Sequence, residues 1–223
     1  MRSVSYLGFG GVLVLAMVAA SSAVGASAEA FVDAPQPSVT APVSGKTETA
    51  VFAGGCFWGV EGVFDHVKGV ASATSGYAGG RAGAATYEEV STGTTGHAEA
   101  VRVIFDPARV SYADLLRVYF SVVADPTTLN AQGPDHGSQY RTALFPQSAA
   151  QERVARAYLQ QLTASHIFSR PIVTRIEHAD HFYPAEGYHQ NFMAKNPTYP
   201  YIVINDAPKV DALRRMMPRL YRS

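Results

Sequence analysis

The segment Ala53–Glu61, with the sequence Ala-Gly-Gly-Cys-Phe-Trp-Gly-Val-Glu, constrains the fold of this chain more than any other stretch. It contains Cys56 and Trp58, the only cysteine and the only tryptophan among 223 residues. The apolar run 49–52 before it predicts a strand, and residues 57–64 carry apolar side chains at helical spacing. Two adjacent glycines permit a sharp turn between these elements. The segment therefore predicts a thiol on the first turn of a helix that directly follows a strand.

A thiol in that place has two features of a reactive group. The unsatisfied N–H groups and the macrodipole at a helix N-terminus favour thiolate over thiol. Phe57 and Trp58 add an apolar wall beside Cys56. The alternative is a buried, inert cysteine, which is the commoner fate of a single cysteine. The flanking glycines and Trp58 favour the nucleophile.

The composition limits the class of protein. Lys and Arg equal Asp and Glu at 18 each, so no charge excess indicates a nucleic-acid or acidic partner. With 47% hydrophobic residues the chain can build one sizeable core. A single cysteine excludes an internal disulfide and a cysteine-based zinc or iron–sulfur site. The nearest histidines, His178, His181 and His189, lack compact ligand spacing, so we expect no bound metal.

The N-terminus has the pattern of a targeting segment. Arg2 supplies a positive charge, residues 7–20 are apolar, and Ala26-Ser27-Ala28 matches an A-x-A cleavage site. The apolar run is short for a membrane span. We therefore predict a signal peptide over residues 1–28 and an exported protein, periplasmic or secreted. An uncleaved membrane anchor is the alternative.

Residues 29–47 carry Pro35, Pro37 and Pro42 and show no periodicity, so we expect a disordered linker there. A single folded domain is expected over residues 48–223. Its strands and helices alternate irregularly, which favours an α+β fold, a two-layer α/β sandwich of the ferredoxin-like kind with helices packed against a mixed sheet. Further expected elements are strands at 69–77, 97–106, 142–145 and 171–178, helices at 111–120, 148–164 and 208–217, and a helical centre in the aromatic segment 181–192.

Glu99 is the second residue that the pattern singles out. In the strand 97–106, the period of two places it on the same face as Val101, Val103 and Phe105. A carboxyl group on a core face is either paired or neutral with a raised pKa. Glu99 is therefore a candidate acid, with an ordinary buried glutamate or a slipped register as the alternatives.

Phenols and a carboxylate on loops complete the set of candidates. Tyr77, Tyr87 and Tyr140 offer donors that stay protonated at neutral pH, and Asp135 could orient one of them. A cysteine–histidine pair using His97 or His136 lacks any local signature.

Several segments together resemble one known family. Gly55–Gly59, with the sequence Gly-Cys-Phe-Trp-Gly, resembles the active-site motif of the A-type peptide methionine sulfoxide reductases. The resemblance covers about residues 48–205. Its other matching segments are Gly76–Gly80, Thr86-Tyr87, Gly96–Val101, Tyr112, Asp135–Arg141, Phe182–Glu186, Tyr188–Gln190 and Lys195–Pro197.

The resemblance implies thiol-dependent reduction of methionine (S)-sulfoxide, free or in proteins, to methionine. It implies that the methyl group of the substrate docks against Phe57 and Trp58 while the Cys56 thiolate attacks the sulfur. Glu99 then gives a proton to the sulfoxide oxygen, and Cys56 is left as a sulfenic acid.

The same resemblance implies roles for the polar groups. The phenols of Tyr87 and Tyr140 hydrogen-bond the sulfoxide oxygen, and Asp135 belongs to the network that holds these groups and activates the thiol. Tyr77 lies in a matching motif, but we interpret it as structural.

Many relatives resolve the sulfenic acid with a second cysteine, whereas this chain has one cysteine in all. It therefore resembles the one-cysteine members, which implies an external reductant, either a thioredoxin-like protein or a small thiol. No bound cofactor is implied. We expect a monomer that repairs oxidised exported proteins and has no stable membrane association after signal cleavage.

Two other functions fit parts of the pattern. A non-catalytic binder could use the aromatic residues to hold methionine-like side chains, and a thiol peroxidase or redox sensor could use Cys56 against peroxide. A binder has no need of Cys56, Glu99, Tyr87 and Tyr140 together, and a peroxidase is expected to lack the Phe57-Trp58 pair.

Overall fold

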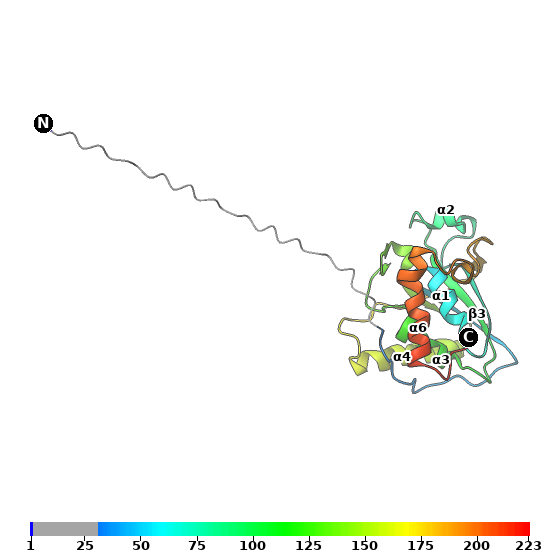
Figure 1. The fold of residues 1–223 in the computed structure, drawn as a ribbon. Coiled ribbons are helices and arrows are strands. Elements are labelled where there is room, and N and C mark those ends of the chain that lie inside the picture. Colours follow the sequence, from blue (N-terminus) through cyan, green and yellow to red (C-terminus); the bar gives the residue numbers. More distant parts are fainter. Residues whose placement is uncertain (2–30) are drawn as a thin grey trace.

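The computed structural model describes residue 1 and residues 31–223, so the predicted signal peptide lies outside the described residues. Within the described part, no helix combines the length and apolarity needed to cross a bilayer. Residues 31–223 fold around a six-stranded sheet with helices packed on it (Figure 1).

The sheet has six strands in the order β7-β6-β1-β3-β2-β8. All neighbours are antiparallel except β6 and β7, which run parallel. The predicted α+β fold with a mixed sheet is therefore confirmed. The strands are β1 Glu48–Gly54, β2 Val70–Ala78, β3 Ala98–Phe105, β6 Thr142–Phe145, β7 Arg175–Ile176 and β8 Phe182–Pro184.

The helices are interspersed with the strands along the chain, and a small hairpin forms a separate two-stranded sheet. The helices are α1 Phe57–Asp65, α2 Tyr87–Val90, α3 Tyr112–Val118, α4 Ala149–Ser165, α5 Phe192–Lys195 and α6 Ala207–Met216. Single π-helical turns extend α3 over Tyr119–Val123 and precede α6 over Ile202–Asp206. The hairpin pairs β4 Ala131–Gln132 with β5 Asp135–His136, and 3₁₀ turns span Ala82–Ala84 and Ser138–Tyr140.

Successive side chains of each strand point to opposite faces of the sheet, so the apolar residues form two separate clusters, one on each face. Phe52 on β1 and Val101 and Val103 on β3 belong to the larger cluster, which also holds the buried faces of α1, α3, α4 and α6. The other face of the sheet carries a smaller cluster of mainly small residues, with Ala100 among them. Each fully buried Phe or Val contributes about 1.5–3 kcal/mol relative to exposure. The helices α1 and α6 lie side by side, and α1 packs on the sheet (Figure 1).

Residues 31–38 contradict the expected disordered linker. Ala34 is fully buried, its N–H donates to the Ser121 hydroxyl, and its carbonyl accepts from Arg117 Nε. The Tyr158 hydroxyl donates to the Pro35 carbonyl over 2.7 Å. Prolines disfavour helix and interior strand, but they do not prevent an extended segment from lying against helices that offer donors. This segment therefore covers α3 and α4.

Two element predictions were wrong. The strand expected over 171–178 is reduced to β7, and the centre of the aromatic segment 181–192, where a helix is expected, forms turns that follow β8. β8 pairs with β2, and the Ala185 N–H donates to the Ser75 carbonyl. Pairing with a strand more than a hundred residues away in the chain holds the start of this segment extended, and a local sequence pattern does not report such distant pairing.

Candidate active site

Cys56 lies where β1 turns into α1, as predicted. It is the N-cap of α1 and is half-buried. Gly55 before it has φ +89°, and a Cβ there would lie 2.6 Å from Cβ of Gln132. Only glycine allows this backbone to turn so closely against the β4–β5 hairpin. The thiol is thus held at the N-terminal end of α1 by the turn itself.

Glu99 points from β3 to the same end of α1. Its side chain is 3% exposed, and Oε2 accepts a hydrogen bond from the Phe57 backbone N–H over 3.0 Å. Burial raises the pKa of Glu99 to about 8, and the charge of Asp135 adds to the rise while the Phe57 hydrogen bond opposes it. Glu99 is therefore mostly protonated at neutral pH, which is the state that a general acid needs.

The environment of the thiol differs from the expectation of a helix-lowered pKa. Burial raises the pKa of Cys56 well above its ordinary value, and the charge of Glu99, which is ionised above about pH 8, and the charge of Asp206 raise it further. The backbone N–H of Trp58 acts in the opposite direction but does not outweigh them. Burial and nearby carboxylates therefore outweigh the one lowering contribution, which comes from an N–H group in the first turn of α1.

The two aromatic residues after Cys56 have different surroundings. Phe57 is 1% exposed and packs between Tyr77 and His189, with ring centroids 5.9 and 5.0 Å away. Trp58 is half-buried and stacks on Phe192 at 3.8 Å. Phe57 therefore supports the site from within, and the accessible ring surface of the predicted pair comes from Trp58.

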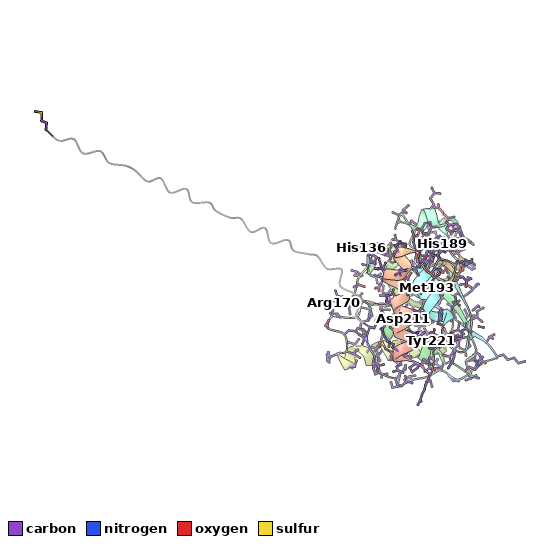
Figure 2. All side chains as sticks on the ribbon, in the orientation of Figure 1. His136, Arg170, His189, Met193, Asp211 and Tyr221 are labelled. Carbon is purple, nitrogen blue, oxygen red and sulfur yellow. The ribbon has the colours of Figure 1, made fainter. Side chains whose placement is uncertain are left out.

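His189 fixes the indole. Trp58 Nε1 donates to His189 Nδ1 over 3.1 Å, and the histidine is buried. Burial lowers the pKa of His189, so the ring is neutral and can accept this bond. Figure 2 shows His189 near one end of α1, and the 5.0 Å between its ring and that of Phe57 identifies this as the N-terminal end.

The two predicted oxygen-binding phenols come from separate segments, as expected. Tyr87 is the first residue of α2 and is 36% exposed, while Tyr140 ends a 3₁₀ turn and is half-buried. Burial raises the pKa of both phenols, and the charges of Glu99 and Cys56 contribute to each rise. Both hydroxyl groups are protonated at neutral pH and lie within electrostatic reach of the thiol and the acid.

Asp135 joins the site through a residue that sequence reasoning missed. The Tyr201 hydroxyl donates a short hydrogen bond to Asp135 Oδ2, and the Tyr201 ring meets Trp58 edge-on at 5.9 Å. Burial raises the pKa of Asp135, whereas the Tyr201 bond and the charge of Lys209 lower it. Tyr201 lies outside the matching motifs, so no local signal identified it.

Asp206 was also missed. It is 1% exposed, and a Cβ on Gly59 would lie 2.2 Å from its Oδ1. The Asp206 carboxyl group therefore lies against the first turn of α1, where its charge raises the pKa of Cys56 and Glu99. Only the glycine at position 59 hints at a close neighbour in the sequence.

A cysteine–histidine pair is not formed by either predicted histidine. His97 is buried, with Nδ1 accepting from the Gly80 N–H over 3.1 Å and Nε2 bonded to the Arg81 carbonyl over 2.9 Å. His136 is exposed on the β4–β5 hairpin. With both of its ring nitrogens bonded to the main chain, His97 cannot act as a base toward Cys56.

Comparison with known sequences gives one consistent family. The family described as peptide methionine sulfoxide reductase matches residues 48–219. Peptide methionine sulfoxide reductase MsrA 2 of Mesorhizobium japonicum is 57% identical over 175 residues, which is 78% of this chain and 90% of that protein. MsrA of Deinococcus radiodurans is 51% identical over 168 residues, covering 75% of this chain and 81% of that protein.

Solved structures agree with the sequences. Mxr1 from Saccharomyces cerevisiae in its reduced form has a TM-score of 0.62 and 32% identity, covering 72% of this chain and 92% of that one. Methionine sulfoxide reductase A of Corynebacterium diphtheriae has a TM-score of 0.59 and 30% identity, covering 75% and 90%. Sequence and fold thus place this chain in the peptide methionine sulfoxide reductase family, the A-type enzymes that reduce methionine sulfoxide in a thiol-dependent reaction.

Proposed function

We propose that Cys56 is the nucleophile and Glu99 the general acid for reduction of methionine (S)-sulfoxide, free or in proteins. The observation that carries this proposal is their joint position at the start of α1, where Glu99 Oε2 accepts the N–H of the residue after Cys56. A protonated carboxyl beside a thiol supplies a proton donor and a nucleophile for one sulfur–oxygen group.

The step balances without a cofactor. Glu99 gives its proton to the sulfoxide oxygen, the Cys56 sulfur attacks the substrate sulfur, and the thiol proton returns to Glu99. The sulfur–oxygen bond and the transient bond between the two sulfur atoms then break as the hydroxyl group passes to Cys56, so the methionine sulfur gains two electrons and Cys56 becomes a sulfenic acid. Protonation of the oxygen raises the electrophilicity of the sulfur. Because burial has raised the pKa of the Cys56 thiol, ionising it costs free energy. Protonation of the sulfoxide oxygen offsets this cost.

The remaining site residues have supporting roles in this proposal. The Tyr87 and Tyr140 hydroxyl groups donate to the oxygen as charge builds on it. Trp58 offers its ring to the substrate methyl group, and Phe57 supports the site from beneath. Asp135, held by Tyr201, belongs to the polar network around the thiol.

A stereospecific assay tests the activity. Blocked methionine S- and R-sulfoxides are each incubated with the protein and dithiothreitol, with Cys56→Ser as the inactive control. We expect methionine from the S isomer alone. Equal reduction of both isomers, or activity in Cys56→Ser, would contradict the proposal.

We further propose that an external thiol, either a thioredoxin-like protein or a small thiol, completes the cycle. The sequence supports this because it contains one cysteine, so no second thiol of the chain can resolve the sulfenic acid. One thiol forms a mixed disulfide with Cys56 and releases water, and a second releases Cys56 as the free thiol. Mass spectrometry after one turnover without reductant should find one added oxygen on Cys56. An unmodified thiol would exclude this cycle.

Finally, we propose that the protein is exported and repairs oxidised proteins outside the cytoplasm as a monomer. Arg2, the apolar run 7–20 and the Ala26-Ser27-Ala28 site support export. N-terminal sequencing of the protein from the exported fraction should give a start near residue 29, and a retained Met1 would favour the anchored alternative. Light scattering of the purified protein should give the mass of one chain.

A further inference from the structure

The position of Tyr87 is not explained by its own helix. α2 has only four residues, and Tyr87, Glu88 and Glu89 are all exposed. A helix of this length has no independent stability in water. The phenol therefore depends on contacts with other elements to stay near Cys56 and Glu99.

Glu186 provides such a contact. Its Oε1 accepts the Tyr87 backbone N–H over 2.9 Å, and its Oε2 accepts the Tyr77 hydroxyl over 2.9 Å. Tyr77 is fully buried on β2, and its register partner on β3 is Glu99. One carboxylate thus joins the start of α2 to the strand pair that carries the acid.

The charge state of Glu186 strengthens this link. Burial by itself would raise the pKa of Glu186, but the hydrogen bonds from the Tyr87 N–H, from its own N–H and from the Tyr77 hydroxyl together lower the pKa below its ordinary value. The group is therefore ionised at neutral pH. Hydrogen bonds to an ionised acceptor are about twice as strong as those between neutral groups.

The backbone around Glu186 is itself anchored. The Ala185 N–H donates to the Ser75 carbonyl on β2, and the His189 N–H donates to the Glu186 carbonyl, each over 2.9 Å. The His189 ring then contacts the Tyr87 ring at 4.5 Å and accepts from Trp58. The carboxylate is thus presented from a segment that also holds the indole.

We propose that Glu186 is a positioning residue that sets the Tyr87 hydroxyl toward the sulfoxide oxygen, acting through the N–H of Tyr87 and the buried Tyr77. This inference rests on the proposed role of Tyr87 as an oxygen donor. Glu186 itself does not touch the reacting atoms in this scheme.

A double-mutant cycle on the first chemical step tests it. The rate of methionine formation in a single turnover without reductant is measured for Glu186→Ala, Tyr87→Phe and the double variant. Loss of one oxygen donor slows such steps by about 10²-fold. We expect Glu186→Ala to approach the loss of Tyr87→Phe, and the double variant to be no slower than Tyr87→Phe alone.

Two variants separate positioning from general damage to the fold. Glu186→Gln keeps an acceptor for the Tyr87 N–H but loses the charge, so it should be faster than Glu186→Ala and slower than the unmodified enzyme. Glu88→Ala removes an equal charge from the exposed side of α2 and should leave the rate unchanged. A thermal melt of each variant identifies any loss of rate that follows from unfolding.

The outcomes distinguish a failure of the positioning role of Glu186 from a failure of the proposed role of Tyr87. If Tyr87→Phe keeps the full rate, the proposed role of Tyr87 fails, and the inference fails with it. If Tyr87→Phe is slow but Glu186→Ala reduces the rate by the same factor with and without Tyr87, only the inference about Glu186 is overturned. A folded Glu186→Gln variant that is no faster than Glu186→Ala would also overturn it.

Discussion

The backbone N–H of Phe57 donates to Oε2 of Glu99 over 3.0 Å, which fixes the buried carboxyl to the residue that follows Cys56. The two residues lie on different elements, the first on α1 and the second on β3. Because the bond uses one of the free N–H groups at the start of the helix, the helix end both holds the acid and carries the thiol.

Glu99→Gln should slow the single-turnover rate by about 10²–10⁴-fold, the usual contribution of a general acid. Burial raises the pKa of Glu99 to about 8, so the unmodified enzyme should lose its proton-donating form as pH rises through that value. The loss caused by the substitution should therefore shrink above pH ~8. Rates measured across this range check the prediction, and an equal loss at every pH would contradict it.

The same carboxyl should make stability depend on pH. Glu99 has an ordinary pKa of 4.5 and a folded pKa of about 8, so the folded state binds its proton more tightly. Stability should then fall as pH rises between those values, by an amount on the order of a few kcal/mol. Urea unfolding should show that Glu99→Gln removes much of this slope and is the more stable protein above pH ~8. Parallel curves for the two proteins would rule out the raised pKa.

Gly59→Ala should destabilise the protein, although alanine normally stabilises a helix interior by ~1 kcal/mol relative to glycine. A Cβ at this position would lie 2.2 Å from Oδ1 of Asp206, so the carboxyl must move. Overpacking of this kind costs about 1–3 kcal/mol. Gly83→Ala is the matched control, because nothing lies within 4 Å of its added Cβ. If denaturant unfolding gives the same change in the free energy of unfolding for both variants, the predicted clash is contradicted.

A protein that begins at residue 39 should be less stable than one that begins at residue 31. The shorter protein loses the buried Ala34 and its bonds to Ser121 and Arg117. Each lost hydrogen bond contributes about 0.5–1.5 kcal/mol. Equal thermal midpoints for the two proteins would show that this segment does not stabilise the domain. Tyr158→Phe, which removes one bond to Pro35, should give a smaller loss of its own.

Much of the local structure could be predicted from the sequence because it depends on neighbouring residues. The turn at Gly55 places Cys56 on α1, the period of two buries Glu99 on β3, and Ser111 begins the helix expected at 111–120. The roles predicted for Phe57 and Trp58 needed the structure to separate them, because both are aromatic and only packing shows that one is buried.

The sequence by itself determined the strand–turn–helix unit, the single thiol and the family motifs, because each depends on adjacent or regularly spaced residues. Only the tertiary structure decided what surrounds that thiol. Tyr201 reaches Asp135 across 66 positions, and Glu186 reaches Tyr77 across 109. Burial, with the carboxylates of Glu99 and Asp206 from other elements, raises the pKa of Cys56 instead of lowering it, because desolvation depends on the whole fold whereas the helix dipole is local.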